Sequence, residues 1–158
     1  MSGTEPHGKG PGGGDAPKLP ELPGITIEHE IARGGMGVVY RGRQDFLDRR
    51  VAVKFLSMDL GGEDFAKRFQ REAKILAGIN HPNIVACHMA DTTPEGQSYL
   101  VMEFIDGPNL KAWIEKHGAL APMAALRLVR AAAAARAHAH TVGIIHRDVK
   151  PENVLLEA

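Results

Sequence analysis

The 158-residue chain has the length of one domain, and its 44% apolar and 24% charged residues are typical of a soluble globular protein. Its formal net charge of zero disfavours nucleic acid or an anionic membrane surface as a partner. The lone cysteine, Cys87, excludes an internal disulfide and favours a reducing compartment.

Nothing in the sequence predicts a membrane segment. No apolar run approaches the roughly 18 residues of a membrane-spanning helix, and the N-terminus lacks an apolar signal core. Ser2 stands where N-myristoylation requires glycine. We therefore expect a cytoplasmic location, and a membrane anchor in a further C-terminal part stays an open alternative.

Residues 1–24 contain seven Gly and five Pro, and such a segment buries too little apolar surface to order itself. We predict a disordered tail. Its stretch from Gly3 to Gly10 resembles a P-loop, but no strand precedes it, no helix follows it, and Gly10 replaces the required Ser or Thr. This stretch is interpreted as linker.

From Ile25 the apolar residues begin to alternate, which predicts a small antiparallel sheet with short connections. Three glycines, Gly34, Gly35 and Gly37, indicate a turn after the first strand. The expected strands cover residues 25–31, 38–40, 51–56, 84–85 and 99–102.

Three helices are predicted as well. In residues 63–79, Phe65, Phe69, Leu76 and Ile79 share one face, and Glu72 lies in the middle of that apolar face. A Gly-Pro break at residues 106–109 precedes a short helix at 110–116. A long Ala-rich helix follows at 122–141, with proline in its first turn and glycine just past its end.

Two features suit a phosphate ligand. In Ala-Arg-Gly-Gly-Met-Gly-Val-Val, residues 32–39, glycines allow backbone N–H groups to approach phosphate oxygens, although a plain hairpin turn would look similar. In the strand at 51–56, Lys54 lies on the face opposite Val51, Val53 and Phe55. A carboxylate on a buried helix face needs a partner, so we predict an ion pair between Glu72 and Lys54. The alternative is a Glu72 side chain that reaches water.

Residues 146–153, His-Arg-Asp-Val-Lys-Pro-Glu-Asn, match the catalytic loop of protein kinases, H-R-D-L-x-x-x-N. With the other motifs in order, the chain resembles eukaryotic-like (Hanks-type) Ser/Thr protein kinases from about residue 25 to 156, and its glycine turn is most similar to bacterial members. Lys150, two residues after Asp148, resembles the Ser/Thr rather than the Tyr kinase version. The other motifs lie at 51–54, Glu72, 81–85 and 102–104.

The resemblance implies an α+β, protein-kinase-like fold in two lobes. The N-lobe (25–103) would have a five-stranded antiparallel sheet and one helix, joined by a hinge (103–107) to a partial helical C-lobe (107–158). The implied function is transfer of the ATP γ-phosphate to Ser/Thr hydroxyls of protein substrates, with Mg²⁺. Small-molecule phosphotransferases of related fold are considered as well. They usually lack the Lys-Pro-Glu continuation, so they are only the runner-up.

The resemblance also assigns roles. Asp148 would accept or orient the hydroxyl proton, Lys150 would neutralise charge on the transferred group, and Asn153 would hold Mg²⁺. Met102 would be the gatekeeper beside the adenine, Asn109 is considered for the ribose, and Leu76 and His146 match the regulatory spine. The nucleotide-binding residues would be Ile31, Ala32 (in place of the first glycine), Gly34, Gly37, Val39, Ala52, Lys54, Glu72, Met102, Glu103, Ile105 and Leu155.

Two departures bear on activity. The sequence stops at Ala158 before any Asp-Phe-Gly, so we expect weak or no activity from these residues alone, and a non-catalytic nucleotide-binding or interaction module is the alternative. On the long helix, a stripe that the family fills with apolar residues contains Arg136, which would need a carboxylate, a route to water, or an exposed helix. An exposed apolar helix face would favour self-association.

Overall fold

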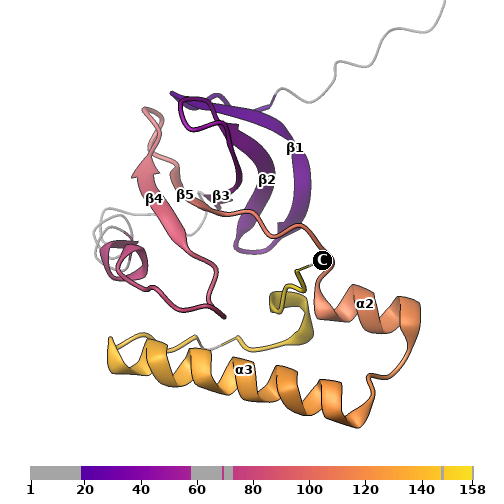
Figure 1. The fold of residues 1–158 in the computed structure, drawn as a ribbon. Coiled ribbons are helices and arrows are strands. Elements are labelled where there is room, and N and C mark those ends of the chain that lie inside the picture. The colour runs from indigo at the N-terminus through magenta and orange to yellow at the C-terminus, as the bar shows by residue number, and fades with distance from the viewer. Residues whose placement is uncertain (1–18, 58–68, 70–72, 147, 158) are drawn as a thin grey trace, which may run out of the picture.

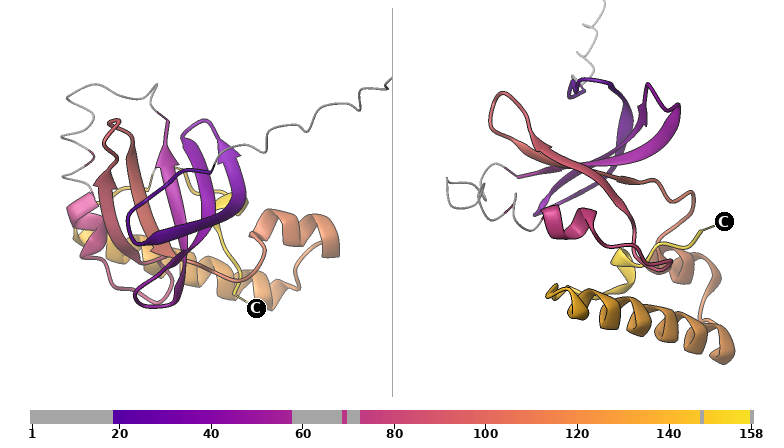
Figure 2. Two further views of the ribbon diagram at one scale, coloured as in Figure 1. Left: turned by 90° about the horizontal axis from the view of Figure 1, so that it is seen from above. Right: turned by 60° about the vertical axis from the view of Figure 1, so that its left-hand side comes forward.

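The computed structural model describes residues 19–57, 69, 73–146 and 148–157. These residues form an α+β fold with an antiparallel sheet followed by a helical part. In Figures 1 and 2 the curved sheet lies on one side and the long helix α3 (Pro122–Thr141) runs along the other. The chain crosses between them after the last strand, as the predicted two-lobed arrangement requires.

The sheet has five strands in the order β1-β2-β3-β5-β4, and each neighbouring pair is antiparallel. This confirms the predicted sheet. The strands are β1 (Ile25–Gly34), β2 (Gly37–Gln44), β3 (Arg49–Leu56), β4 (Cys87–Thr92) and β5 (Ser98–Glu103).

The core of the sheet lies on one face of β3 and β5. Val51 and Val53 are fully buried, and Phe55 packs with Tyr99 and Val101 in the same cluster. Alternate residues of a strand point to opposite faces, so this cluster leaves Ala52 and Lys54 on the other face. Leu22 also belongs to the core. Within the stretch predicted as a tail, residues 19–24 are described, and Leu22 packs in the same cluster as Ile25 of β1. Residues 1–18 lie outside the described ranges.

The strand predicted at residues 84–85 is wrong: β4 begins three residues after Ile84, at Cys87. His81 Nδ1 accepts a hydrogen bond from the Asn83 backbone N–H at 3.1 Å, and the Ile84 N–H donates to the His81 carbonyl at 3.0 Å. These bonds hold residues 81–84 in a turn. The chain joins the sheet only where Cys87 pairs with Met102.

The helices predicted at 110–116 and 122–141 are confirmed as α2 (Leu110–His117) and α3. Asn109 caps α2 by accepting a hydrogen bond from the Ala112 N–H at 2.8 Å. Of the helix predicted at 63–79, only Phe69 and residues 73–77 are described and helical; it ends before Ile79, which is nonetheless buried. Within the described ranges, none of the helices is long and apolar enough to cross a bilayer.

The face of α3 that packs inward differs from the predicted stripe. Ala135 is the buried residue of α3, and Leu128 is partly buried on the same side. Leu126 and Val129 are 60% and 66% exposed, and Arg136 is exposed at the border of the cavity that Leu128 and Ala135 also line. The alanines of α3 occur on all sides of the helix, so the periodicity of its apolar residues does not identify the face that packs inward. Arg136 therefore reaches water and carries no cost of a buried charge.

Candidate active site

The glycine turn joins β1 to β2. Gly34 pairs with Gly37 across the hairpin, and Met36 is exposed at its tip. Gly37 has φ +141°, and a Cβ built on it would lie 1.9 Å from the Phe55 carbonyl oxygen. A Cβ on Gly34 or Gly35 would meet open space. Gly37 is thus required by the close approach of β3, whereas the other two glycines leave the hairpin tip unobstructed.

The sheet face opposite the core collects several residues of the predicted nucleotide site. Val39 lies directly across from Lys54, which in turn lies across from Leu100. Ala52 is aligned with Met102 in the same way. Directly opposed residues of antiparallel strands project to the same side. Val39, Ala52, Lys54 and Met102 therefore share one face, and Glu72, the predicted partner of Lys54, lies outside the described residues.

The hinge begins where β5 ends. Glu103 is fastened to the segment before β4, because its N–H donates to the Ala86 carbonyl at 2.9 Å and its side chain accepts from the Ala86 N–H at 3.3 Å. Ile31 and Leu155, both predicted to contact adenine, are 44% and 45% exposed. The structure therefore shows them as accessible apolar surface.

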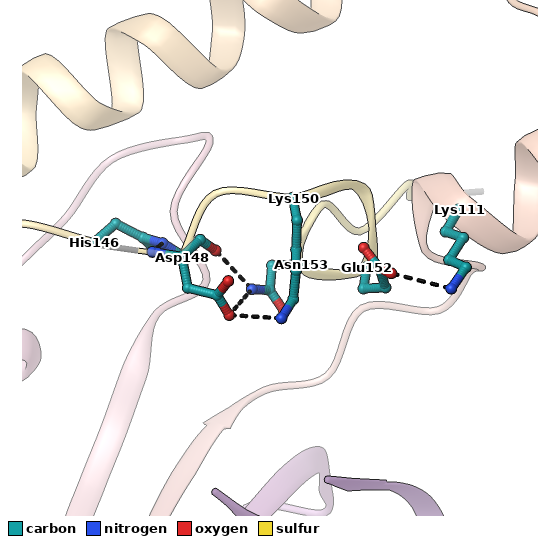
Figure 3. Close-up of polar contacts among 6 residues, drawn as sticks. All are labelled: Lys111, His146, Asp148, Lys150, Glu152 and Asn153. Carbon is teal, nitrogen blue, oxygen red and sulfur yellow. Dashed lines mark hydrogen bonds and ion pairs between the residues drawn. The ribbon is translucent and has the colours of Figure 1, made fainter. Parts of the chain in front are cut away.

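The catalytic loop is organised around Asp148 (Figure 3). Lys150 Nζ lies 2.8 Å from the Asp148 carboxylate. The Asn153 amide nitrogen donates to the Asp148 carbonyl at 2.8 Å and to its carboxylate at 3.1 Å. Pro151–Asn153 form the short 3-10 helix η2, which carries Asn153 back toward Asp148. Local sequence thus brings the three predicted catalytic side chains together.

This geometry keeps the loop charged. The hydrogen bond from Lys150 lowers the pKa of Asp148, and the bond from Asn153 adds to that effect. The same ion pair raises the pKa of Lys150. Near neutral pH the pair therefore consists of a carboxylate, which can accept a proton, and an ammonium, which can stabilise a developing anion.

Asn153 also presents a group suited to a metal ion. The Asn153 amide nitrogen donates to the Asp148 backbone carbonyl and to one Asp148 carboxylate oxygen. The amide oxygen of Asn153 is therefore the end of the side chain that can face a ligand. Mg²⁺ prefers oxygen donors and usually takes only one or two protein ligands beside phosphate oxygens and water. The Asn153 oxygen and the Asp148 carboxylate fit that preference. No group of three or more His, Cys, Asp or Glu suited to a metal occurs among the described residues.

A cavity of about 580 Å³ lies between α3, the segment 82–85, the hinge and the catalytic loop. Five predicted site residues line it: Glu103, Ile105, Lys150, Asn153 and Leu155. Leu76 and His146, matched to the regulatory spine, line the same cavity. Hinge and catalytic loop, some 45 residues apart in sequence, are therefore brought to one concave surface.

Contacts that the sequence did not predict fasten the loop to α2. The Leu110 N–H donates to the Val154 carbonyl at 2.8 Å, and the Leu156 N–H donates to the Pro108 carbonyl at 2.9 Å. Lys111 Nζ lies 3.1 Å from a Glu152 carboxylate oxygen (Figure 3). No single-sequence pattern links residues so far apart. Asn109, considered for the ribose, has its side-chain oxygen engaged as the cap of α2.

A fold with this sheet, hinge and loop defines a protein kinase. The protein kinase domain family matches residues 25–158, and the chain belongs to this family. The predicted resemblance to Ser/Thr kinases, with bacterial proteins among its relatives, is confirmed by the comparisons that follow.

The chain is 46% identical over 135 residues to a probable serine/threonine-protein kinase PknB of Lactococcus lactis subsp. lactis (84% of this chain, 21% of the relative). It is 41% identical over 129 residues to the serine/threonine-protein kinase PrkC of Bacillus subtilis (80% and 20%). The chain thus spans about a fifth of their length. Among solved structures, a double mutant of the Mycobacterium tuberculosis PknI kinase domain superposes with a TM-score of 0.78 at 31% identity (86% of this chain, 56% of that one).

Proposed function

We propose that the chain binds Mg-ATP between the sheet and the catalytic loop and supplies the base of a protein serine/threonine kinase. The observation that carries the proposal is the cluster of Asp148, Lys150 and Asn153, of which Lys150 and Asn153 border the cavity also lined by the hinge. Membership of the family supports the same chemistry.

In this proposal the adenine lies against the sheet face that carries Val39, Ala52 and Met102, with Ile31 and Leu155 closing over it. The backbone of Glu103 and Ile105 hydrogen-bonds the base. Ala32, Gly34 and Gly37 border the phosphates through the hairpin backbone, and Lys54, held by Glu72, contacts them.

The transfer step is a displacement at phosphorus. The acceptor Ser or Thr oxygen forms a bond to the γ-phosphorus while the bond from that phosphorus to the bridging oxygen breaks, and ADP leaves with those electrons. The hydroxyl proton passes to the Asp148 carboxylate. Lys150 is already charged and next to Asp148, so it can turn to the transferring oxygens without a change of protonation. Asn153 would hold Mg²⁺, which neutralises phosphate charge when bound.

We further propose that residues 1–158 by themselves transfer phosphate weakly or not at all. The family places a second metal-binding Asp in an Asp-Phe-Gly segment, and the printed sequence contains none after Asn153. A non-catalytic nucleotide-binding or interaction module is the second candidate. The sheet face and the hinge lie in the described N-terminal part, which favours nucleotide binding even without turnover.

The test combines binding and turnover. Mg-ATP should raise the melting temperature of the chain, and Lys54→Met should abolish that rise. Radiolabel transfer to a generic acceptor protein should be weak, and Asp148→Asn should remove whatever is present. Transfer at ordinary kinase rates would overturn the proposal of weak activity. No Mg-ATP stabilisation in the wild type would overturn nucleotide binding itself.

Two finer proposals concern the whole chain. The single cysteine supports a reducing, cytoplasmic location. The exposed apolar side chains of Met123, Leu126 and Val129, three residues apart on α3, support self-association through this helix.

A further inference from the structure

Five side chains form a connected group behind the hinge, which we call the hinge cluster: Glu28 of β1, Arg41 of β2, Arg50 of β3, and Phe104 and Asp106 of the hinge. The Arg41 and Arg50 guanidinium carbons lie over the Phe104 ring, 5.2 Å and 5.5 Å from its centroid. Both distances are within the range of cation–π attraction. Two strands of the sheet thus converge on one aromatic ring of the hinge.

Each cation in the hinge cluster has its own carboxylate. Arg41 Nε lies 2.7 Å from a Glu28 oxygen, and an Arg50 terminal nitrogen lies 2.6 Å from an Asp106 oxygen. Two guanidinium groups over one ring would repel each other, and the two carboxylates offset that repulsion. The planar, weakly hydrated guanidinium also stacks on aromatic faces in a way that ammonium does not. The cluster is therefore neutral overall and links β1, β2 and β3 to the hinge.

The position of Phe104 in the backbone gives this cluster its importance. The peptide plane before Phe104 contains the Glu103 carbonyl, and the plane after it contains the Ile105 N–H. The proposed function assigns the backbone of these two residues to hydrogen bonds with the base, and the carbonyl can accept while the N–H can donate. Only the two backbone dihedrals of Phe104 relate one plane to the other. A ring held by Arg41 and Arg50 consequently restricts the angle between the two groups.

We propose that the hinge cluster positions the hinge backbone and thereby sets the affinity for the nucleotide, an inference that rests on the proposed function. Arg41, Arg50 and Phe104 are positioning residues in this scheme, because they act through the backbone of Glu103 and Ile105. Glu28 and Asp106 hold the two arginines in place.

The experiment uses the whole chain and two readouts. Dissociation constants for Mg-ADP are measured by calorimetry for the wild type, Arg50→Gln, Phe104→Leu and the double variant. Amide hydrogen exchange of residues 104–107 is followed without nucleotide. Arg43→Gln is the matched control: Arg43 lies directly across from Arg50 in the sheet and is also an exposed arginine paired with an aspartate, Asp48, at 3.0 Å, but it is not one of the two arginines over the Phe104 ring.

The expected result is a dissociation constant about three- to tenfold higher for Arg50→Gln and for Phe104→Leu. The double variant should bind no more weakly than the poorer single variant, because the contact between Arg50 and the ring is already lost in Phe104→Leu. Exchange of the hinge amides should accelerate in these variants, and Arg43→Gln should leave affinity and exchange unchanged. Additive effects would indicate independent structural losses and would overturn the inference.

The two proposals fail in different ways. A wild type that binds Mg-ADP no better than its Arg50→Gln variant overturns the positioning role and leaves nucleotide binding intact. A wild type that binds no Mg-ADP overturns the proposed function and, with it, the link to affinity. In that case the exchange rates of the hinge amides still test whether the hinge cluster orders the backbone. Exchange that is unchanged in Arg50→Gln would overturn this ordering role as well.

Discussion

Gly37 and the Phe55 carbonyl oxygen approach so closely that a Cβ on the glycine would lie 1.9 Å from that oxygen. The glycine therefore has a structural task separate from any phosphate. It lets β2 begin pairing with the end of β3, where Gly37 lies across from Leu56, and the Ser57 N–H donates to the Met36 carbonyl at 3.1 Å.

Gly37→Ala should lower the free energy of unfolding by about 2–5 kcal/mol, because the new methyl group collides with backbone and φ at this position is positive. Urea unfolding measures the change. Gly35→Ala is the control, since a Cβ there meets open space, and it should change the free energy of unfolding by less than about 1 kcal/mol. Equal effects at the two positions would contradict this account of the hairpin.

Lys150→Met should raise the pKa of Asp148 toward its ordinary range, because the largest cause of its lowered pKa is the hydrogen bond from Lys150. In the wild type the stabilising ion pair is present above the unfolded-state pKa and is lost as pH falls through the lower, folded-state pKa. In the variant Asp148 takes up its proton at a higher pH. Carbon NMR titration of the carboxyl group follows this directly.

Lys111→Met provides the control for that titration. Its ammonium pairs with Glu152 and is not among the causes of the lowered Asp148 pKa. The Asp148 titration should be unchanged in this variant, whereas the pKa of Glu152 should rise. A Lys150→Met protein with a wild-type Asp148 titration would show that the ion pair does not persist in solution.

Self-association through α3 should weaken when its exposed apolar side chains become polar. Leu126→Gln with Val129→Gln should lower the association constant in sedimentation equilibrium and change the free energy of unfolding by no more than about 0.5 kcal/mol per site. Leu128→Gln, on the side that lines the cavity, should instead destabilise the fold. A wild-type protein that stays monomeric at every concentration in the sedimentation experiment would contradict this proposal.

Arg136→Leu tests whether the Arg136 guanidinium reaches water from the cavity side of α3. Because Arg136 is exposed, the substitution should change the free energy of unfolding by no more than about 0.5 kcal/mol. If the guanidinium were instead buried in an apolar stripe, leucine would stabilise the fold by relieving a desolvated charge. Thermal and urea unfolding together distinguish an exposed from a buried guanidinium.

The sequence predicts the sheet well because Val51, Val53 and Phe55 alternate without interruption and permit one inner face only. It predicts the catalytic loop because Asp148, Lys150 and Asn153 meet through local turns. It misplaces β4, since the side chain of His81 competes for the backbone of the next residues. It also misses the ring contacts of Phe104, which depend on arginines more than fifty residues earlier in the chain.

The paired hydrogen bonds between residues 108–110 and 154–156 have a consequence for dynamics. They close a long ring of chain that contains both α2 and α3. Separating the two segments would break the hydrogen bonds of the Leu110 and Leu156 amides in a single opening event. The hydrogen-exchange rates of these two amides should therefore change together. A partner that separates α2 from residues 154–156 would therefore also increase the mobility of the segment that follows Asn153.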